Sequence, residues 1–188
     1  MDPRRLQLAE LLDFRPDEGI IRLHEQRVVI LSAAALGLLR KELIDTLGLE
    51  TARRLLMRFG FADGYHDAVS LRDRNAWSNP MEGLRTGAVV HTLEGIVRSD
   101  LTSVAFDSDT GRFEAEAEWH DSYEAEQHVH HYGASAQPVC WSLVGYVSGY
   151  ASACFEREIY FREESCLGQG KTICSVIGKD ASGWGDEV

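Results

Sequence analysis

The pattern of apolar and polar positions predicts a chain that mixes strands and helices. The sharpest alternation covers 112–119, where Phe113, Ala115, Ala117 and Trp119 alternate with arginine and glutamate. This period of two predicts a strand with one buried face and one wet face, paired with 101–107 across a turn at 108–111. The other expected strands are 158–162, 173–177 and a hairpin of 19–23 with 27–31 that turns at 24–26.

Helical spacing predicts the elements between these strands. Ser32 is a plausible N-cap for a leucine-rich helix that ends at Gly48. A second helix begins near Glu50, although Gly60 and Gly64 are expected to weaken its middle. Further helices are expected over 80–96, 122–131 and 138–154, and a short amphipathic segment over 6–14. The expected fold class is α/β in the mixed, α+β sense.

The amino-acid composition disfavours several classes of function. A chain of 188 residues is long enough to bury a sizeable core. A net charge of -11 disfavours direct binding to nucleic acid or to an anionic membrane surface. Without a signal peptide or an apolar run long enough to span a bilayer, and with only 4 cysteines, we expect a cytoplasmic protein with reduced thiols and no membrane partner.

Two thiols, Cys166 and Cys174, flank a glycine-containing loop directly after an acidic pair. Thiolates on such a loop suit a tetrahedral zinc ion. Only one further thiol can join them, because Cys140 and Cys154 lie on one predicted helix, roughly 21 Å apart along its axis. We favour Cys140, since the first helical turn stabilises a thiolate. The fourth ligand is then a carboxylate or an imidazole, and Glu163 is the nearest candidate; unrelated buried thiols are the alternative.

Other candidate chemistry has a simpler explanation. The segment 168–172 mimics the end of a phosphate-binding loop, but a β-branched run follows it instead of a helix. His128, His130 and His131, with His120 nearby, can be interpreted as a second metal cluster; we favour a solvated helix face with one satisfied histidine. No convincing catalytic constellation is present, so we expect no enzyme.

His91 and Trp119 form a candidate binding pair. His91 falls on an otherwise apolar helix, and Trp119 ends the buried face of a strand. An imidazole and an indole N–H can converge on a hydroxyl inside an apolar cavity. Taken alone, each residue is more often a satisfied core side chain, so the pattern leaves both interpretations open.

Four runs carry a resemblance to a known family. They are Trp119-His-Asp-Ser122-Tyr-Glu124-Ala-Glu126-Gln-His128, Pro138-Val-Cys140-Trp141, Gly145-Tyr146-Val-Ser-Gly149-Tyr150, and Glu163-x-x-Cys166 with Cys174 beyond. Together they resemble the sensor domain of bacterial xylene- and phenol-responsive activators of sigma-54-dependent transcription, which contains a vinyl-4-reductase-type domain. The resemblance covers essentially the whole chain.

The resemblance implies a set of site residues. Structural zinc is expected on Cys140, Glu163, Cys166 and Cys174, and His91 with Trp119 is expected to anchor the hydroxyl of a small aromatic effector. The expected pocket wall is Leu84, Leu101, Ala117, Tyr150 and Phe161. Because the His91–Trp119 pair can anchor a hydroxyl, the effector is expected to be a phenol or a substituted phenol. Phenol sensors carry bulky aromatic residues where this chain has Leu84, Ala117 and Phe161, and this difference leaves the size and substitution of the ring open. Alkylbenzenes, hydroxybiphenyls and, in a different class, a zinc-dependent enzyme are the alternatives.

The resemblance also implies an organisation. Residues 1–75 are expected to form a dimerisation part with a hairpin and helices, and residues 76–179 to bind the aromatic ligand and zinc. Residues 180–188 begin a linker to an ATPase module, which a DNA-binding module accompanies in the full-length family members. A homodimer is expected, in which the effector relieves repression of the ATPase.

Overall fold

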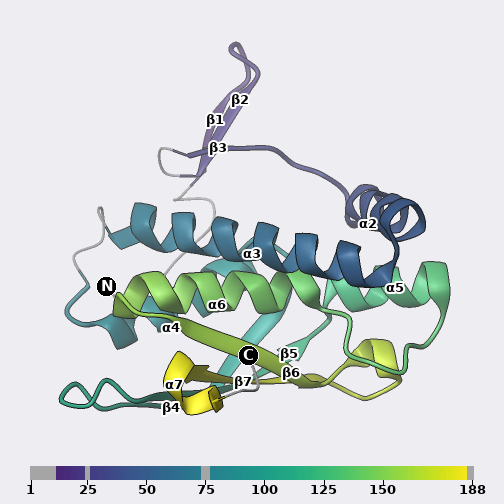
Figure 1. The fold of residues 1–188 in the computed structure, drawn as a ribbon. Helices are drawn as coiled ribbons and strands as arrows, with labels where there is room; N and C mark the ends of the chain where they lie inside the picture. The colour runs from purple at the N-terminus through teal and green to yellow at the C-terminus, as the bar shows by residue number, and fades with distance from the viewer. Residues whose placement is uncertain (1–11, 24–25, 73–76, 186–188) are drawn as a thin grey trace.

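The computed structural model describes residues 12–23, 26–72 and 77–185 (Figure 1). Its N-terminal sheet joins β1 (Leu12–Arg15), β2 (Ile20–Leu23) and β3 (Gln26–Val28), all antiparallel. The predicted hairpin is therefore confirmed, with most of its turn outside the described residues. The predicted amphipathic segment also lies mainly outside them, and its end belongs to β1. The stretch 29–31, expected to be strand, carries no secondary structure.

Two consecutive helices follow, as predicted. α2 (Ala33–Leu47) begins at Ser32, whose hydroxyl accepts a hydrogen bond from the Ala35 amide, and it ends at Gly48. α3 (Leu49–Arg72) runs without a break. The glycines that were expected to weaken the middle of α3 do not interrupt it. A Cβ on Gly64 would lie 2.1 Å from the backbone carbonyl oxygen of Tyr146 on helix α6 (Trp141–Phe155). The absence of a side chain at Gly64 therefore allows the two helices to pack closely.

The second sheet has the strand order β4-β5-β7-β6, and every neighbouring pair is antiparallel. Its strands are β4 (Arg98–Phe106), β5 (Phe113–His120), β6 (Ile159–Ser165) and β7 (Cys174–Asp180). The predicted alternation along β5 is confirmed, because Phe113, Ala115, Ala117 and Trp119 are all buried. In the β4–β5 register, Ser99 pairs with Trp119 and Leu101 with Ala117, which places each pair on one face of the sheet.

The remaining helices are α4 (Pro80–Leu93), α5 (Tyr123–Tyr132), α6 (Trp141–Phe155) and the short α7 (Ala181–Trp184), with a 3-10 turn η2 (Leu167–Gln169). α4 ends before the predicted residue 96 because Gly95 has a left-handed φ of +74°. α6 begins later than predicted, and Cys140 is its N-cap instead of part of its first turn. The Cys140 amide donates to Glu163 Oε2 on β6 (3.0 Å), which holds this residue outside the helix.

The way the helices pack on the four-stranded sheet determines where the candidate site lies. α6 lies over the β4–β7 sheet, and α3 packs along α6 on the side away from that sheet (Figure 1). The division of the chain into parts 1–75, 76–179 and 180–188 stays a prediction, and α3 from the first part packs along α6 from the second. No helix in the described ranges is long and apolar enough to cross a lipid bilayer.

Candidate functional site

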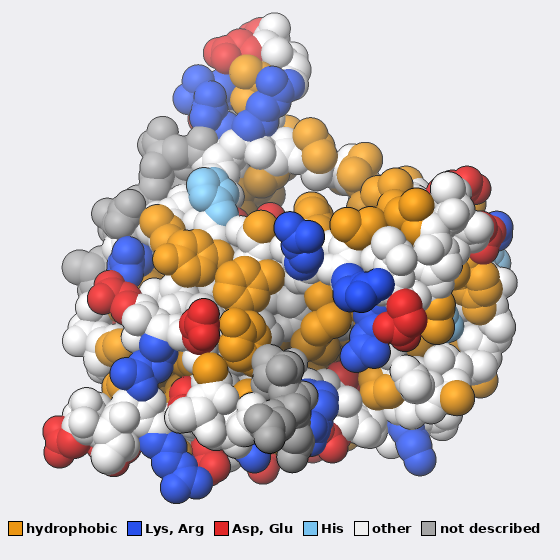
Figure 2. Space-filling model, in the orientation of Figure 1, with side chains coloured by type: hydrophobic (Ala, Val, Ile, Leu, Met, Phe, Trp, Pro, Cys, Tyr) orange, Lys and Arg blue, Asp and Glu red, His pale blue; other side chains and the backbone are white. Residues whose placement is uncertain are grey.

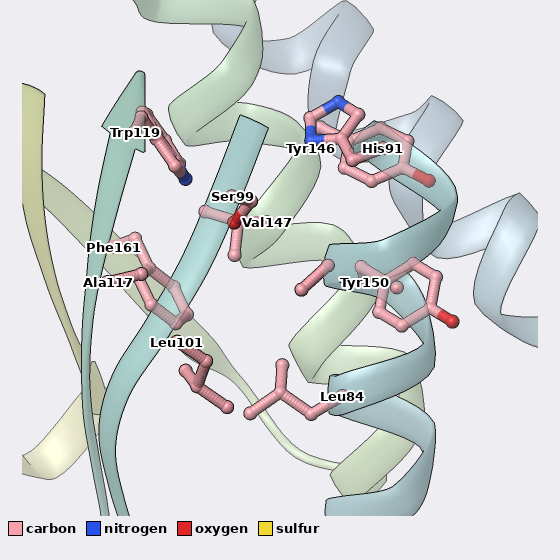
Figure 3. Close-up of a pocket in the computed structure, with 12 residues that line it drawn as sticks. Leu84, His91, Ser99, Leu101, Ala117, Trp119, Tyr146, Val147, Tyr150 and Phe161 are labelled. Carbon is pink, nitrogen blue, oxygen red and sulfur yellow. The ribbon is translucent and has the colours of Figure 1, made fainter. Parts of the chain in front are cut away.

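A small cavity of about 30 Å³ lies between the sheet and the helices α4 and α6 (Figure 3). All seven residues predicted as ligand contacts line it: Leu84, His91, Leu101, Ala117, Trp119, Tyr150 and Phe161. Their roles as contacts stay predictions. The sequence reasoning missed other members of the lining: Gly87, Ala88, Ser99, Tyr146 and Val147. Tyr146 could have been found, since it lies one helical turn before Tyr150 on the same face.

The polar groups gather at one end of this cavity. His91 and Trp119 each direct a ring nitrogen into the space between helix and strand (Figure 3). Within the described residues, neither side chain forms a hydrogen bond. Burial lowers the pKa of His91 to about 3, so its imidazole is neutral at physiological pH. Its ring stacks on Tyr146 with 4.1 Å between centroids, and the Tyr146 hydroxyl donates to Asp67 Oδ2, away from the cavity.

Two glycines shape the apolar end. A Cβ on Gly87 would lie 2.4 Å from the Tyr150 ring, and one on Gly178 would lie 2.4 Å from the Phe161 ring. The rings of Tyr150 and Phe161 therefore occupy the space that a side chain at position 87 or 178 would fill. The β6 backbone is tied to α6, because the Phe161 amide donates to Ser148 Oγ (2.9 Å). The position of the Phe161 ring is thus set by Gly178 below it and by a fixed backbone.

The second candidate site is a buried cluster of Cys140, Glu163, Cys166 and Cys174, whose ligand atoms all lie within 4.8 Å of one another. The sulfur–sulfur distances are 3.7, 3.7 and 3.8 Å. A tetrahedral zinc ion with Zn–S bonds of about 2.3 Å separates two sulfurs by about 3.8 Å. The residues present therefore fit a zinc ion, and the cluster can hold a metal.

The polar surroundings of the cluster agree with this fit. The amides of Leu167 and Gly168 donate to the sulfurs of Cys174 and Cys166 at 3.3 and 3.2 Å, which favours thiolates. Glu163 Oε1 is buried without a hydrogen-bond partner among the described residues. Burial and the nearby Cys166 raise the pKa of Glu163 to about 8. A bound cation would satisfy this oxygen and stabilise the crowded negative charges.

The other candidate ligands do not join a metal site. The Cys154 sulfur lies against Gly83, and burial raises the pKa of this thiol to about 12. His128 is buried, with Nδ1 at 3.5 Å from an Arg40 nitrogen, while His130 is exposed. In the part of the chain that the structure describes, the Cys140 cluster is the one group of three or more such side chains with metal-binding geometry.

A buried ion pair that the sequence reasoning missed supports the cluster. Glu124 on α5 pairs with Arg40 on α2 and accepts hydrogen bonds from the amides of Ser142 and Leu143 at the start of α6. Arg40 also donates to the Val139 carbonyl (2.8 Å). These contacts hold the segment on both sides of Cys140.

Comparison with known proteins identifies the family. Residues 7–107 match the family model described as activator of aromatic catabolism, and residues 119–180 match the V4R domain. The chain belongs to this family of activators of aromatic catabolism. It is 36% identical over 179 residues to the transcriptional regulatory protein XylR of Pseudomonas putida, with 95% of this chain covered. It is 35% identical over 180 residues to the phenol regulator MopR of Acinetobacter guillouiae, with 94% covered.

In both relatives the match spans 32% of the relative's length. The fold is similar to that of the phenol-responsive sensory domain of the transcription activator PoxR with phenol, at 41% identity and a TM-score of 0.90, covering 96% of this chain and 90% of that one. A trafficking protein particle complex subunit 3 from Naegleria fowleri, covalently bound to palmitic acid, shares the fold at 10% identity and a TM-score of 0.54, covering 79% of this chain and 94% of that one.

Proposed function

We propose that this chain is the effector-sensing domain of a transcription activator and binds a phenol or a substituted phenol. The observation that carries the proposal is the cavity, which is apolar apart from the groups gathered around His91 and Trp119. The phenol regulator and the phenol-bound sensory domain among its relatives support the same ligand class. The proposed role is regulatory and not enzymatic.

The two ring nitrogens suit a neutral hydroxyl. The Trp119 indole can only donate, and the neutral His91 imidazole can accept. A phenol hydroxyl can accept from the first and donate to the second. An alkylbenzene leaves both groups unpaired, and a buried unpaired polar group costs about 1–3 kcal/mol, or roughly 5- to 150-fold in affinity.

Binding requires the cavity to expand. Its volume is about 30 Å³, whereas an engineered apolar cavity that binds benzene has a volume of about 150 Å³. Since the Phe161 amide is bonded to Ser148, the side chain of Phe161 can rotate more easily than its strand can shift. Ala117 provides less obstruction than an aromatic residue would, which favours a ring with a substituent.

In the full-length protein, we propose, the domain restrains an ATPase module in cis until effector binds, and a separate module contacts DNA. This chain corresponds to 32% of the length of the relatives. Their description as regulators supports the arrangement. The cytoplasmic location expected from the sequence agrees with such a role.

We infer that Zn²⁺ occupies the cysteine–glutamate cluster as a structural ion. Four protein ligands close a tetrahedral sphere and leave no position for substrate or water. The ion would tie the start of α6, through Cys140, to Glu163 on β6 and to Cys174 on β7. A zinc-dependent enzyme, the alternative function, needs an open ligand position that these four side chains do not leave.

We also infer a homodimer, as the family resemblance implies. Val29, Ile30 and Leu31 are 58–76% exposed, and Leu38 and Phe59 are exposed nearby on α2 and α3. Figure 2 shows apolar side chains gathered over these elements. Exposed apolar surface of this kind marks an interface. Sedimentation should give twice the chain mass, and Ile30→Asp should shift it to the monomer.

Isothermal titration calorimetry with phenol, toluene and 2-hydroxybiphenyl tests the ligand class. We expect binding of at least one hydroxylated ring and weaker binding of toluene. His91→Leu should remove the preference for phenol over toluene. The absence of heat with every aromatic compound would refute the proposed function.

A further inference from the structure

Ser99 places a third polar side chain at the hydroxyl end of the cavity. It lies on β4 directly opposite Trp119, and the two side chains share one face of the sheet. Cross-strand neighbours of this kind have Cβ atoms about 4.5–5.5 Å apart. Figure 3 shows the Ser99 hydroxyl in the space between Trp119 and the helices. Within the described residues, this hydroxyl has no hydrogen-bond partner.

The backbone at Ser99 is also tied to the helix that carries His91. The Ser99 amide donates to Thr92 Oγ1 (3.1 Å), and the Thr92 hydroxyl donates to the Ala88 carbonyl within α4 (2.9 Å). Because Thr92 follows His91 directly, this contact fixes the distance between the strand end and the imidazole. Ser99, Trp119 and His91 are therefore held relative to one another without a ligand contact.

We propose that Ser99 is a specificity-determining residue that binds a second oxygen substituent next to the ring hydroxyl. The inference rests on the proposed function, and it names the effector class as catechol-type, with two vicinal hydroxyls. Trp119 and His91 already supply a donor and an acceptor for the first hydroxyl. A serine hydroxyl both donates and accepts, so it can pair with the neighbouring hydroxyl in either orientation.

The other ring positions lack such a partner. Beyond the polar end, the side chains of Leu84, Leu101, Ala117 and Phe161 in the cavity wall have no polar atom. Tyr150 also lines the cavity, but its hydroxyl points away from the space between the helices and the sheet (Figure 3). A hydroxyl in the para position points into this wall and loses its water without gaining a hydrogen bond, which is unfavourable. A meta hydroxyl is displaced from Ser99 in the same direction. The predicted order of affinity is therefore catechol above resorcinol and hydroquinone.

The test is calorimetry with phenol, catechol, resorcinol and hydroquinone on the wild type and on Ser99→Ala. Ser103→Ala is the matched control, since Ser103 lies on the same strand and is exposed. The solutions are kept anaerobic, and metal content is measured after each titration, because catechol oxidises and chelates metals. We expect Ser99→Ala to weaken catechol binding about 3- to 10-fold, the size of one net hydrogen bond. Phenol affinity should change less than 2-fold, and Ser103→Ala should change neither.

Two results would overturn the inference. An equal loss of phenol and catechol affinity in Ser99→Ala would show that Ser99 contacts the first hydroxyl or only packs against the ring. Unchanged catechol affinity, or resorcinol binding as tight as catechol in the wild type, would show that no vicinal contact forms. If the wild type binds none of the four compounds, the proposed function itself fails, whereas phenol binding without a specific catechol effect refutes only the role of Ser99.

Discussion

Cys140→Ser and Cys154→Ser form a matched pair, because both replace a buried thiol at opposite ends of one helix. Cys140 belongs to the cluster that can hold a metal ion, and Cys154 does not. A serine hydroxyl does not ionise near neutral pH, so Cys140→Ser removes one ligand of the expected zinc ion. Metal content and thermal unfolding, with and without a chelator, distinguish this loss from ordinary packing damage.

The size of the expected stability loss follows from the thermodynamic coupling between metal binding and folding. A metal present at about 1,000 times its dissociation constant stabilises the folded state by about 4.1 kcal/mol. For a domain of this size, each kcal/mol moves the melting temperature by about 2–4 °C, so losing the ion should lower it by about 8–16 °C. Cys154→Ser buries a hydroxyl beside Gly83 and Trp77 and should cost about 1–3 kcal/mol.

The decisive measurement is the change in melting temperature when a chelator removes the metal. Wild type and Cys154→Ser should each carry one equivalent of zinc and lose stability when it is removed, while Cys140→Ser should carry little zinc and respond little. Retention of a full equivalent by Cys140→Ser, with an unchanged chelator response, would contradict the assignment of Cys140 as a ligand. Equal metal loss in Cys154→Ser would show that the cluster reports only global damage to the fold.

Three further outcomes are expected. Ala117→Phe should weaken binding of 2-hydroxybiphenyl more than 10-fold in calorimetry and spare phenol, since each tenfold step needs only about 1.4 kcal/mol of steric cost; equal losses would show that Ala117 does not limit pocket size. Because the pKa of His91 is about 3 in the folded chain and about 6.5 in the unfolded one, only the unfolded state is protonated between these values. This residue should therefore lower stability by about 2 kcal/mol from pH 7 to pH 5, and urea unfolding of His91→Gln should lack that component. Arg40→Met should cost about 3–5 kcal/mol by leaving Glu124 buried and unpaired, and adding Glu124→Gln should recover part of it in a double-mutant cycle.

Local patterns predicted most elements of the fold. The period along β5 identified its buried face, and Ser32 and Gly48 marked the ends of α2, because cap chemistry depends on neighbouring residues. The sequence-based predictions differ from the structure where contacts between residues far apart in the chain determine the local conformation. From the sequence alone, Gly64 is expected only to lower helix stability, whereas the structure shows that it allows α6 to pack closely against α3. Cys140 lies outside the regular turns of α6 because its amide donates a hydrogen bond to Glu163.

The candidate site was predictable to a similar extent. Helix length allowed only one of Cys140 and Cys154 to join the other two thiols, and the expected position of Cys140 at the helix N-terminus favoured it over Cys154. Recognising Ser99 needs the β4–β5 register, which pairs it with Trp119 from another strand. The Arg40–Glu124 pair joins residues 84 positions apart, and neither residue stands in a pattern that indicates burial.

The strand β6 connects the two candidate sites and allows their roles to be separated. Phe161 faces the cavity, and Glu163, two residues further on the same face, belongs to the cluster that can hold a metal ion. Phe161→Ala should therefore change effector selectivity, admitting larger rings, while zinc content stays at one equivalent. Glu163→Gln should weaken zinc binding and lower the melting temperature, since the neutral amide is a poorer ligand than a carboxylate.

Both variants are compared under one set of conditions, with metal content, melting temperature and affinity for phenol and 2-hydroxybiphenyl measured for each. With excess zinc, Glu163→Gln should recover phenol binding, because the cluster supports the fold and does not touch the effector. Phe161→Ala should not respond to zinc. Loss of zinc in Phe161→Ala, or an effector selectivity in Glu163→Gln that differs from wild type at saturating zinc, would show that the two sites are not separable along this strand.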